Sequence, residues 1–148
     1  MITVSIIMPA FNVSEFVFRS INSVLNQTFQ DWELLIVDDC STDNTVEVIQ
    51  SFADKRIKLI VNTNNLGGAG SRNVAIAKAC GRYLAFLDSD DVWTPEKLEK
   101  QIAFMQRQKV GFSFSGYSTI TEQDEILDKI EVPERVSFSK LLKHNYIG

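Results

Sequence analysis

Three carboxylates stand within four positions at Asp88-Ser89-Asp90-Asp91, directly after the apolar run Tyr83–Leu87. Such a run predicts a strand buried on both faces. The acidic residues would then lie at its carboxyl end, where open α/β sheets bind ligands. Asp90, with Asp88 or Asp91, could hold Mg²⁺ or Mn²⁺ and leave the other coordination positions to water and substrate phosphates. The alternative is a solvated, Asp-rich turn before a helix.

Two further polar segments follow predicted strands. Pro9-Ala10-Phe11-Asn12 comes after the first strand, and Phe11 could form the wall of a base-binding site. Asp38 and Asp39 end the second strand, where Asp39 could accept a hydrogen bond from a uracil imide or a ribose hydroxyl. Asp38 is expected to point inward and orient the loop. Helix capping, the alternative role for this pair, is already supplied by Ser41-Thr42-Asp43.

The segment Gly67-Gly68-Ala69-Gly70 opens a predicted helix, and Arg72 follows in what we expect to be its first turn. Glycines such as Gly68 let a backbone approach phosphate closely, and a helix N-terminus favours an anion. A cation is unfavourable there, so Arg72 is expected to face a phosphate or a carboxylate; the alternative is a surface arginine. A dinucleotide-binding fingerprint is matched only in part, because Asn73 stands at its third glycine.

The elements that would position these clusters follow a β-α-β-α-β-α-β-α-β order. Pro9 is expected to end the first strand and Gly81 to close the third helix as a left-handed cap. Ser14 or Asn12 is expected to cap the first helix. Apolar strands predict a doubly wound, mostly parallel α/β sheet with helices on both faces, which gathers the four clusters along one edge. The expected strands span 4–8, 32–37, 56–61, 83–87 and 110–114, and residues 126–132 are expected to pair back after a turn.

The composition suits one soluble globular domain, since 45% of the 148 residues are hydrophobic and 23% are charged. A net charge of −4 without a basic run gives no reason to expect nucleic acid as a partner. No apolar run is long enough to span a membrane, and Cys40 and Cys80 match no metal or disulfide pattern. A cytoplasmic protein with free thiols is therefore expected. His144 is expected on the surface rather than in catalysis.

Four segments, taken in this order, resemble the N-terminal half of an inverting family 2 glycosyltransferase with the GT-A fold, whose nucleotide-binding half is Rossmann-like. They span 4–12, 36–43, 65–73 and 86–91. The resemblance implies a nucleotide-sugar donor, commonly a UDP-sugar, bound with Mg²⁺ or Mn²⁺. It also implies a nucleotide-sugar-binding domain over 1–120 and the truncated start of an acceptor-side region over 121–148.

The resemblance assigns roles to individual residues. The 9–12 loop and Asp39 would meet the nucleoside, Arg72 would lie near the phosphates, and Glu15 would help to hold the first loop. Asp88 would lie nearer the ribose and Asp90 would bind the metal. Cys40 departs from the pattern, because glycine is usual there. The residues expected to bind the nucleotide-sugar are Pro9, Ala10, Phe11, Asn12, Glu15, Asp38, Asp39, Gly68, Arg72, Asp88, Ser89 and Asp90.

Glycosyltransferases of this type carry a catalytic Asp or Glu base in the half that follows, so the base is expected outside this chain. The expected function is donor binding in a metal-assisted, inverting transfer to a saccharide or lipid-linked acceptor, in the cytoplasm at the inner face of the membrane. A non-catalytic fragment that binds nucleotide or a second copy of itself, and a metal-dependent nucleotidyltransferase, are the alternatives. The acidic residues that match no base motif are Glu122, Asp124, Glu125, Asp128, Glu131 and Glu134.

Overall fold

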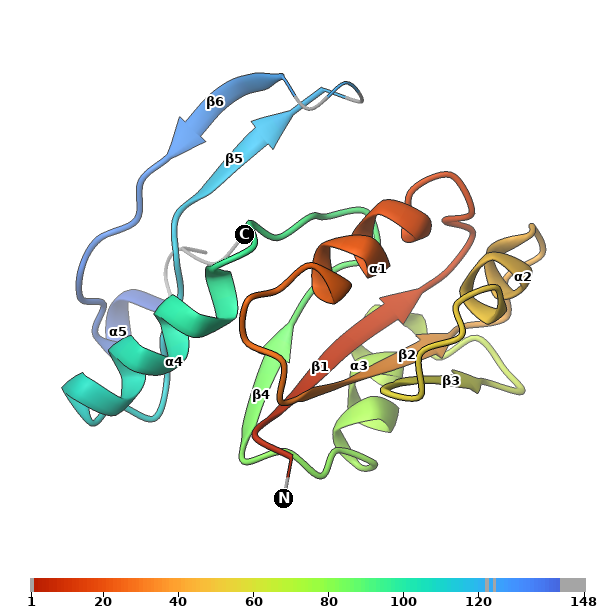
Figure 1. Cartoon of the computed structure of the whole chain (residues 1–148), viewed down its shortest axis with the longest axis horizontal. Helices are drawn as coiled ribbons and strands as arrows, with labels where there is room; N and C mark the ends of the chain where they lie inside the picture. Colours follow the sequence, from red (N-terminus) through yellow and green to blue (C-terminus); the bar gives the residue numbers. More distant parts are fainter. Residues whose placement is uncertain (1, 122, 124, 142–148) are drawn as a thin grey trace. The chain divides into compact units, whose positions relative to one another are not determined.

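A computed structural model describes residues 2–121, 123 and 125–141, so Glu122, Asp124 and His144 lie outside the described residues. The chain forms two compact units, Met1–Ile102 and Ala103–Gly148. The first unit contains a parallel sheet with the strand order β3-β2-β1-β4 (Figure 1). Its elements are β1 Val4–Ala10, α1 Val17–Leu25, β2 Trp32–Asp38, α2 Thr45–Gln50, β3 Ile57–Val61, α3 Gly67–Ile76 and β4 Tyr83–Phe86.

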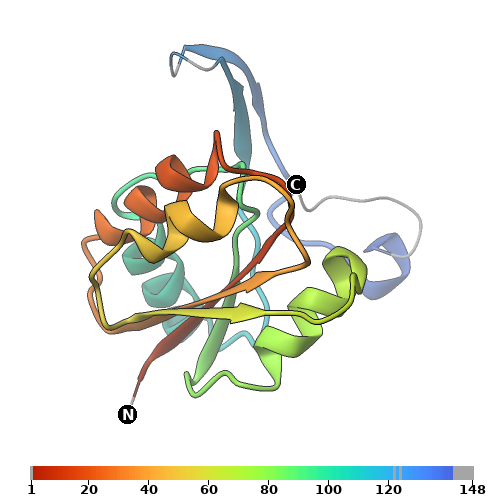
Figure 2. The same ribbon diagram turned by 90° about the vertical axis from the view of Figure 1, so that its right-hand side faces the viewer.

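The two faces of this sheet bury different side chains, because neighbouring residues of a strand point to opposite faces. Ile6 and Leu34 belong to a large apolar cluster that also contains Val17 and Ile21 of α1. Ile7, Leu35 and Val37 pack on the other face with Ala75 of α3. Figure 2 accordingly shows α1 and α2 on one side of the sheet and α3 on the other. The expected doubly wound α/β fold is confirmed.

Pro9 does not end β1, contrary to the prediction. Pro9 lies opposite Val37 in the β1–β2 pair, and the strand continues to Ala10. The Ile7 carbonyl accepts from Leu87 N–H, so the backbone of Pro9, two residues on, faces the same side. The β1–β4 pairing stops at Ile7, so the missing N–H of proline falls where no strand needs it.

Residues 83–86 form a strand as predicted, but not one buried on both faces. β4 is the last strand in the order of the first unit's described sheet. Leu84 and Phe86 keep 43% and 50% of their surface exposed, whereas Leu87 is buried. An apolar run is therefore compatible with an edge strand that covers the core with one face only.

Two predictions about the ends of helices are wrong. The N-cap of α1 is Phe16, which makes no side-chain capping bond, so neither Ser14 nor Asn12 caps this helix. Gly81 is not a left-handed cap, because Gly67 is the glycine with positive φ in the described chain. A Cβ on Gly81 would lie 2.4 Å from the Ser5 backbone nitrogen, so glycine is required there for close approach to β1.

The chain continues into α4 (Lys97–Gln108), and the second unit contains β5 (Tyr117–Ile120), β6 (Ile126–Ile130) and α5 (Phe138–Leu141). β6 pairs antiparallel with β5, as expected for a chain that pairs back. The strand predicted at 110–114 is wrong: this segment is irregular and belongs to neither of the described sheets. Among the helices of the described ranges, none has the length and apolar character of a membrane span.

Candidate functional site

A cavity of about 210 Å³ lies in the first unit, at the carboxyl ends of β1, β2 and β4 and the start of α3. This is the edge of a parallel sheet where ligands bind in open α/β folds. All four polar clusters singled out in the sequence contribute to its wall. The lining residues are Pro9, Ala10, Phe11, Val13, Asp39, Gly68, Ser71, Arg72, Asp88, Ser89 and Asp90.

The cavity wall differs in five positions from the expected set of residues. Asn12, Glu15 and Asp38 do not line the cavity, whereas Val13 and Ser71 do. Val13 has no chemical feature that would single it out in the sequence. Ser71 had a usable signal, since it is a polar residue on the face of α3 that carries Ala75, and it is fully buried.

Asn12 connects the first loop to the second instead of facing the cavity. Its backbone has a φ of 52°, a left-handed conformation that asparagine tolerates better than most residues. The Asn12 N–H donates to Ser41 Oγ at 3.0 Å, and Asn12 Oδ1 accepts from Thr42 N–H at 2.8 Å. The two loops are therefore held together directly beside the cavity.

Asp43 strengthens this connection between the two loops. Its carboxylate accepts from Ser14 N–H at 3.1 Å, and from the N–H and hydroxyl of Thr45. Burial alone would raise the pKa of Asp43, but the hydrogen bonds from Thr45 and Ser14 lower it to about 2. Asp38 is buried beneath the same loop, where its Oδ2 accepts from Ser41 N–H.

Asp39 lies at the cavity but is already extensively hydrogen-bonded. Its Oδ1 accepts from Asn62 Nδ2 and Leu66 N–H, both at 2.8 Å, and its Oδ2 accepts from Gly67 N–H at 2.7 Å. Only 3% of its surface is exposed. Burial alone would raise the pKa of Asp39, but the hydrogen bonds from Leu66, Asn62, Gly67 and Ser71 hold it below its usual value. The group is therefore an anion at neutral pH.

This bonding changes what the start of α3 can do. The amides of Leu66 and Gly67 donate to Asp39, so these two groups are not free for a phosphate. Asn62 Nδ2 also contacts Ser71 Oγ at 3.1 Å, which links Asp39 to the second turn of the helix. Asp39 thus fixes the position of α3 relative to the sheet edge.

Arg72 and Asp88 form an ion pair at the cavity wall. Because α3 begins at Gly67, Arg72 stands in the second turn rather than the first. The unfavourable effect of the helix dipole on a cation, which was expected in the first turn, therefore does not apply to it. A Cβ on Gly68 would lie 3.2 Å from Arg72 Nη1, so glycine leaves room for the guanidinium. The Arg72 side chain is 33% exposed, which keeps it accessible from the cavity.

The acidic run, residues 88–91 after β4, presents carboxylates that are accessible rather than enclosed. Asp88 and Asp90 line the cavity, and Asp90 is exposed. Partial burial raises the pKa of Asp91, and the negative charges of Asp90 and Asp88 raise it further. These carboxylates therefore repel one another, as expected of a site that gains from a cation.

The donor set fits a magnesium or manganese ion held by one or two carboxylates. Within the described ranges, no group of three or more His, Cys, Asp or Glu side chains is arranged to enclose a metal. Mg²⁺ commonly keeps several waters and takes its remaining ligands from substrate phosphates, so Asp88 and Asp90 would suffice on the protein side.

Residues 5–146 match the sequence model of glycosyl transferase family 2. The chain belongs to this family. Among similar members, the chain is 46% identical over 145 residues to the Escherichia coli UDP-Glc:alpha-D-GlcNAc-diphosphoundecaprenol beta-1,3-glucosyltransferase WfgD, covering 98% of this chain and 57% of WfgD. It is 44% identical over 148 residues to the Bacillus subtilis putative teichuronic acid biosynthesis glycosyltransferase TuaG, covering 98% of this chain and 59% of TuaG.

The crystal structure of Staphylococcus aureus TarS 1–349 in complex with UDP has the same architecture. It superposes with a TM-score of 0.69 and 30% identity, over 81% of this chain and 40% of TarS 1–349. This family 2 glycosyltransferase chain therefore spans a little more than half the length of WfgD and TuaG. The sheet, α1–α3 and the cavity all lie in the part that is shared in sequence with these two relatives.

Proposed function

We propose that this chain is the donor-binding part of a glycosyltransferase that uses a nucleotide-sugar, with a UDP-sugar as the donor class. The supporting observation is that one cavity collects residues from four separate segments of the chain, at 9–13, 39, 68–72 and 88–90. The UDP-glucose in the name of WfgD and the UDP bound to TarS support the choice of uridine. A lipid-linked or saccharide acceptor is proposed by analogy with WfgD and TuaG, whose names also favour cell-envelope polysaccharide synthesis. Action at the inner face of the membrane stays a prediction from the sequence.

The nucleoside is proposed to lie between Phe11 and Asp39. Phe11 lines the cavity with 49% of its surface exposed, so an aromatic face is available to a base. Asp39 is anionic and buried at the wall, where any free lone pair would accept from a base N–H or a ribose hydroxyl. Asn12, Glu15 and Asp38 would then support the loops rather than touch the donor.

The diphosphate is proposed to lie between Arg72 and the acidic run. The guanidinium of Arg72 can donate two parallel hydrogen bonds to phosphate oxygens. Asp90 and Asp88 would hold Mg²⁺ or Mn²⁺, with Ser89 between them at the cavity wall. A bound metal supplies positive charge that offsets the negative charge developing on the departing diphosphate.

The proposed reaction is a single displacement with inversion. An acceptor oxygen forms a bond to the anomeric carbon of the sugar while the bond from that carbon to the diphosphate oxygen breaks. The acceptor proton passes to a general base, and the nucleoside diphosphate leaves with the bonding electron pair. Arg72 binds the leaving group, and no residue of this chain is assigned as the base.

Calorimetric titration of UDP, with and without Mn²⁺, tests the donor and metal assignments together. The wild-type chain is expected to bind UDP more tightly with Mn²⁺, and Asp90→Ala is expected to abolish that gain. Glu96→Ala, at an exposed acidic residue of the first unit, is the matched control that should retain it. Affinity that does not depend on Mn²⁺, or that Asp90→Ala leaves unchanged, would contradict the metal assignment.

Product analysis separates the proposed class from nucleotidyl transfer. Incubation with a UDP-sugar and a suitable acceptor should release free UDP, whereas nucleotidyl transfer releases or consumes pyrophosphate. Comparing this chain with a longer form that includes a following segment would locate the base. Equal turnover of the two would place the base within these 148 residues.

A further inference from the structure

One face of α1 forms a row of polar contacts to the segment that follows the acidic run. Ser20, Ser23 and Gln27 stand three and four positions apart, so they share one side of the helix and of its C-terminal extension. Apart from bonds within the helix, the partners of these three side chains lie between residues 89 and 98, within the first unit. Ser20 and Gln27 are buried at 0% and 1% exposure, although serine and glutamine usually remain exposed.

Ser20 is the member of this row nearest to the cavity. Its hydroxyl is shared between the Ser89 carbonyl oxygen at 2.8 Å and the Asp91 carbonyl oxygen at 2.6 Å. These two carbonyls flank Asp90, so one hydroxyl fixes the backbone on both sides of it. The Asp91 N–H also donates to the Asp88 carbonyl at 3.1 Å, which closes the acidic run into a turn.

Ser23 and Gln27 continue the row away from the cavity. Ser23 Oγ accepts from Trp93 N–H at 3.1 Å and donates to the Ser20 carbonyl at 2.7 Å. Gln27 Nε2 donates to the Thr94 carbonyl at 2.8 Å, and its Oε1 accepts from Leu98 N–H at 3.0 Å. Both polar atoms of the Gln27 side chain are hydrogen-bonded, so its orientation is fixed from both ends of the amide.

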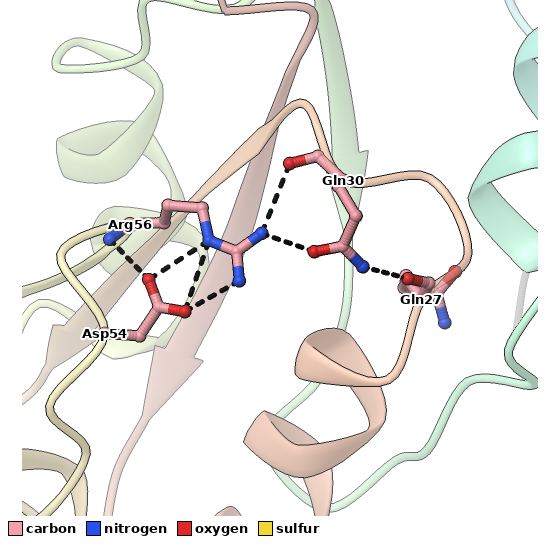
Figure 3. Close-up of polar contacts among 4 residues, drawn as sticks. All are labelled: Gln27, Gln30, Asp54 and Arg56. Atoms are coloured by element: carbon pink, nitrogen blue, oxygen red, sulfur yellow. Dashed lines mark hydrogen bonds and ion pairs between the residues drawn. The ribbon is translucent and has the colours of Figure 1, made fainter.

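The far end of the row is anchored to the sheet, as Figure 3 shows. Gln30 donates to the Gln27 carbonyl, and Arg56 Nη1 donates to both the carbonyl and the Oε1 of Gln30. Arg56 is itself held by Asp54 and lies over the Trp32 ring at 3.7 Å. The row therefore connects the acidic run to the start of β3 and to Trp32 of β2.

We propose that Ser20, supported by Ser23 and Gln27, is a positioning residue that fixes the backbone of residues 88–91 so that Asp88 and Asp90 face the cavity. Within the run, the Asp91 N–H bonds to the Asp88 carbonyl, and the Ser20 hydroxyl adds contacts to the Ser89 and Asp91 carbonyls. The contacts from α1 thus hold the backbone on both sides of Asp90. This inference rests on the proposed function, because it concerns the two residues assigned to the metal.

The test measures UDP affinity with and without Mn²⁺, and takes the ratio of the two as the metal-dependent gain. Ser20→Ala leaves the carbonyls of Ser89 and Asp91 without their donor and is expected to reduce this gain about tenfold. Ser23→Ala, one step further from the cavity, is expected to reduce it about threefold. Ser51→Ala is the matched control, because its hydroxyl also donates to a carbonyl but at the end of α2.

Melting temperatures of the same variants separate positioning from general stability. Lower melting temperatures with an unchanged metal-dependent gain in both Ser20→Ala and Ser23→Ala would overturn the inference. Ser23→Ala keeps the test decisive if Ser20→Ala does not fold. A wild-type gain of one would instead overturn the proposed metal site, and a wild-type gain that only Asp90→Ala abolishes would leave that site standing without a role for Ser20.

Discussion

Asp39 after β2 and Asp90 after β4 line the same cavity, but the chain surrounds them in different ways. Asp39 is buried and accepts hydrogen bonds from Asn62, Leu66 and Gly67, which keep its pKa low. Asp90 is exposed, and its charge helps to raise the pKa of its neighbour Asp91. The first carboxylate builds the cavity wall, whereas the second is left available to a cation.

Removing each carboxylate in turn tests most directly whether Asp39 and Asp90 differ in their contribution to stability. Asp39→Ala leaves several buried donors without an acceptor, so we expect it to lower the free energy of unfolding by about 3 kcal/mol. Asp90→Ala removes a repelling charge from an exposed position, so its effect should stay within about 0.5 kcal/mol. Urea denaturation of both variants at pH 7 measures the difference. Equal losses of stability would contradict the distinction between the two carboxylates.

The acidic run shows how far the sequence alone could lead. The position of Asp88 and Asp90 at the end of an apolar strand predicted a place at the sheet edge, and both line the cavity. The apolar run did not reveal that β4 is exposed on one face, because strand order depends on contacts distant in sequence. Pro9 was misjudged for the same reason, since its tolerance in β1 depends on where β4 ends.

The hydrogen-bonding state of each carboxylate was also beyond sequence analysis. That Asp39 accepts a hydrogen bond from a nucleoside stays a prediction. Its partners within the chain come from residues 62–67, which no local pattern connects to β2. The buried contacts of Ser20 were missed because its spacing on α1 looks like that of an ordinary polar position. Tertiary contacts, rather than residue types, decide which polar groups build a site and which remain available.

Asp43, in the loop after β2, is expected to make the stability of the chain depend on pH. The pKa of Asp43 is lowered to about 2, so its contribution to stability is complete above about pH 4 and is lost as the pH falls towards 2. Asp43→Asn is expected to lower the free energy of unfolding at pH 7 by about 1–2 kcal/mol, as for the loss of a helix-capping carboxylate. Urea denaturation between pH 7 and pH 2.5 provides the measurement. The difference between wild type and variant should shrink below pH 4, and a constant difference would argue against this assignment.

In the acidic run, the pH dependence of stability should have the opposite sign. Because the pKa of Asp91 is raised in the folded chain, its ionised form destabilises the fold above that pKa, and protonation relieves the effect as the pH falls. Asp91→Asn is therefore expected to stabilise the chain at pH 7 by about 0.5 kcal/mol, the order of an exposed like-charge contact. The gain should disappear near pH 3, where wild-type Asp91 is protonated as well. Thermal unfolding at both pH values measures it, and a variant less stable than wild type at pH 7 would reverse the interpretation.

An effect as small as that of Asp91→Asn is expected at Cys40, which follows Asp39 and has a φ of 68°. A left-handed conformation costs a residue with a Cβ about 1–2 kcal/mol, which glycine avoids. Glycine loses about 0.5–1 kcal/mol more backbone entropy on folding, and the contact from Cys40 Sγ to the Asn62 carbonyl would also be lost. Cys40→Gly should therefore stabilise the chain by about 0.5 kcal/mol, while Cys40→Ala, which keeps the Cβ, should not. Urea denaturation of the two variants is the test. If Cys40→Gly were the less stable variant, the thiol contact to Asn62 would outweigh the backbone conformation in holding the wall beside Asp39.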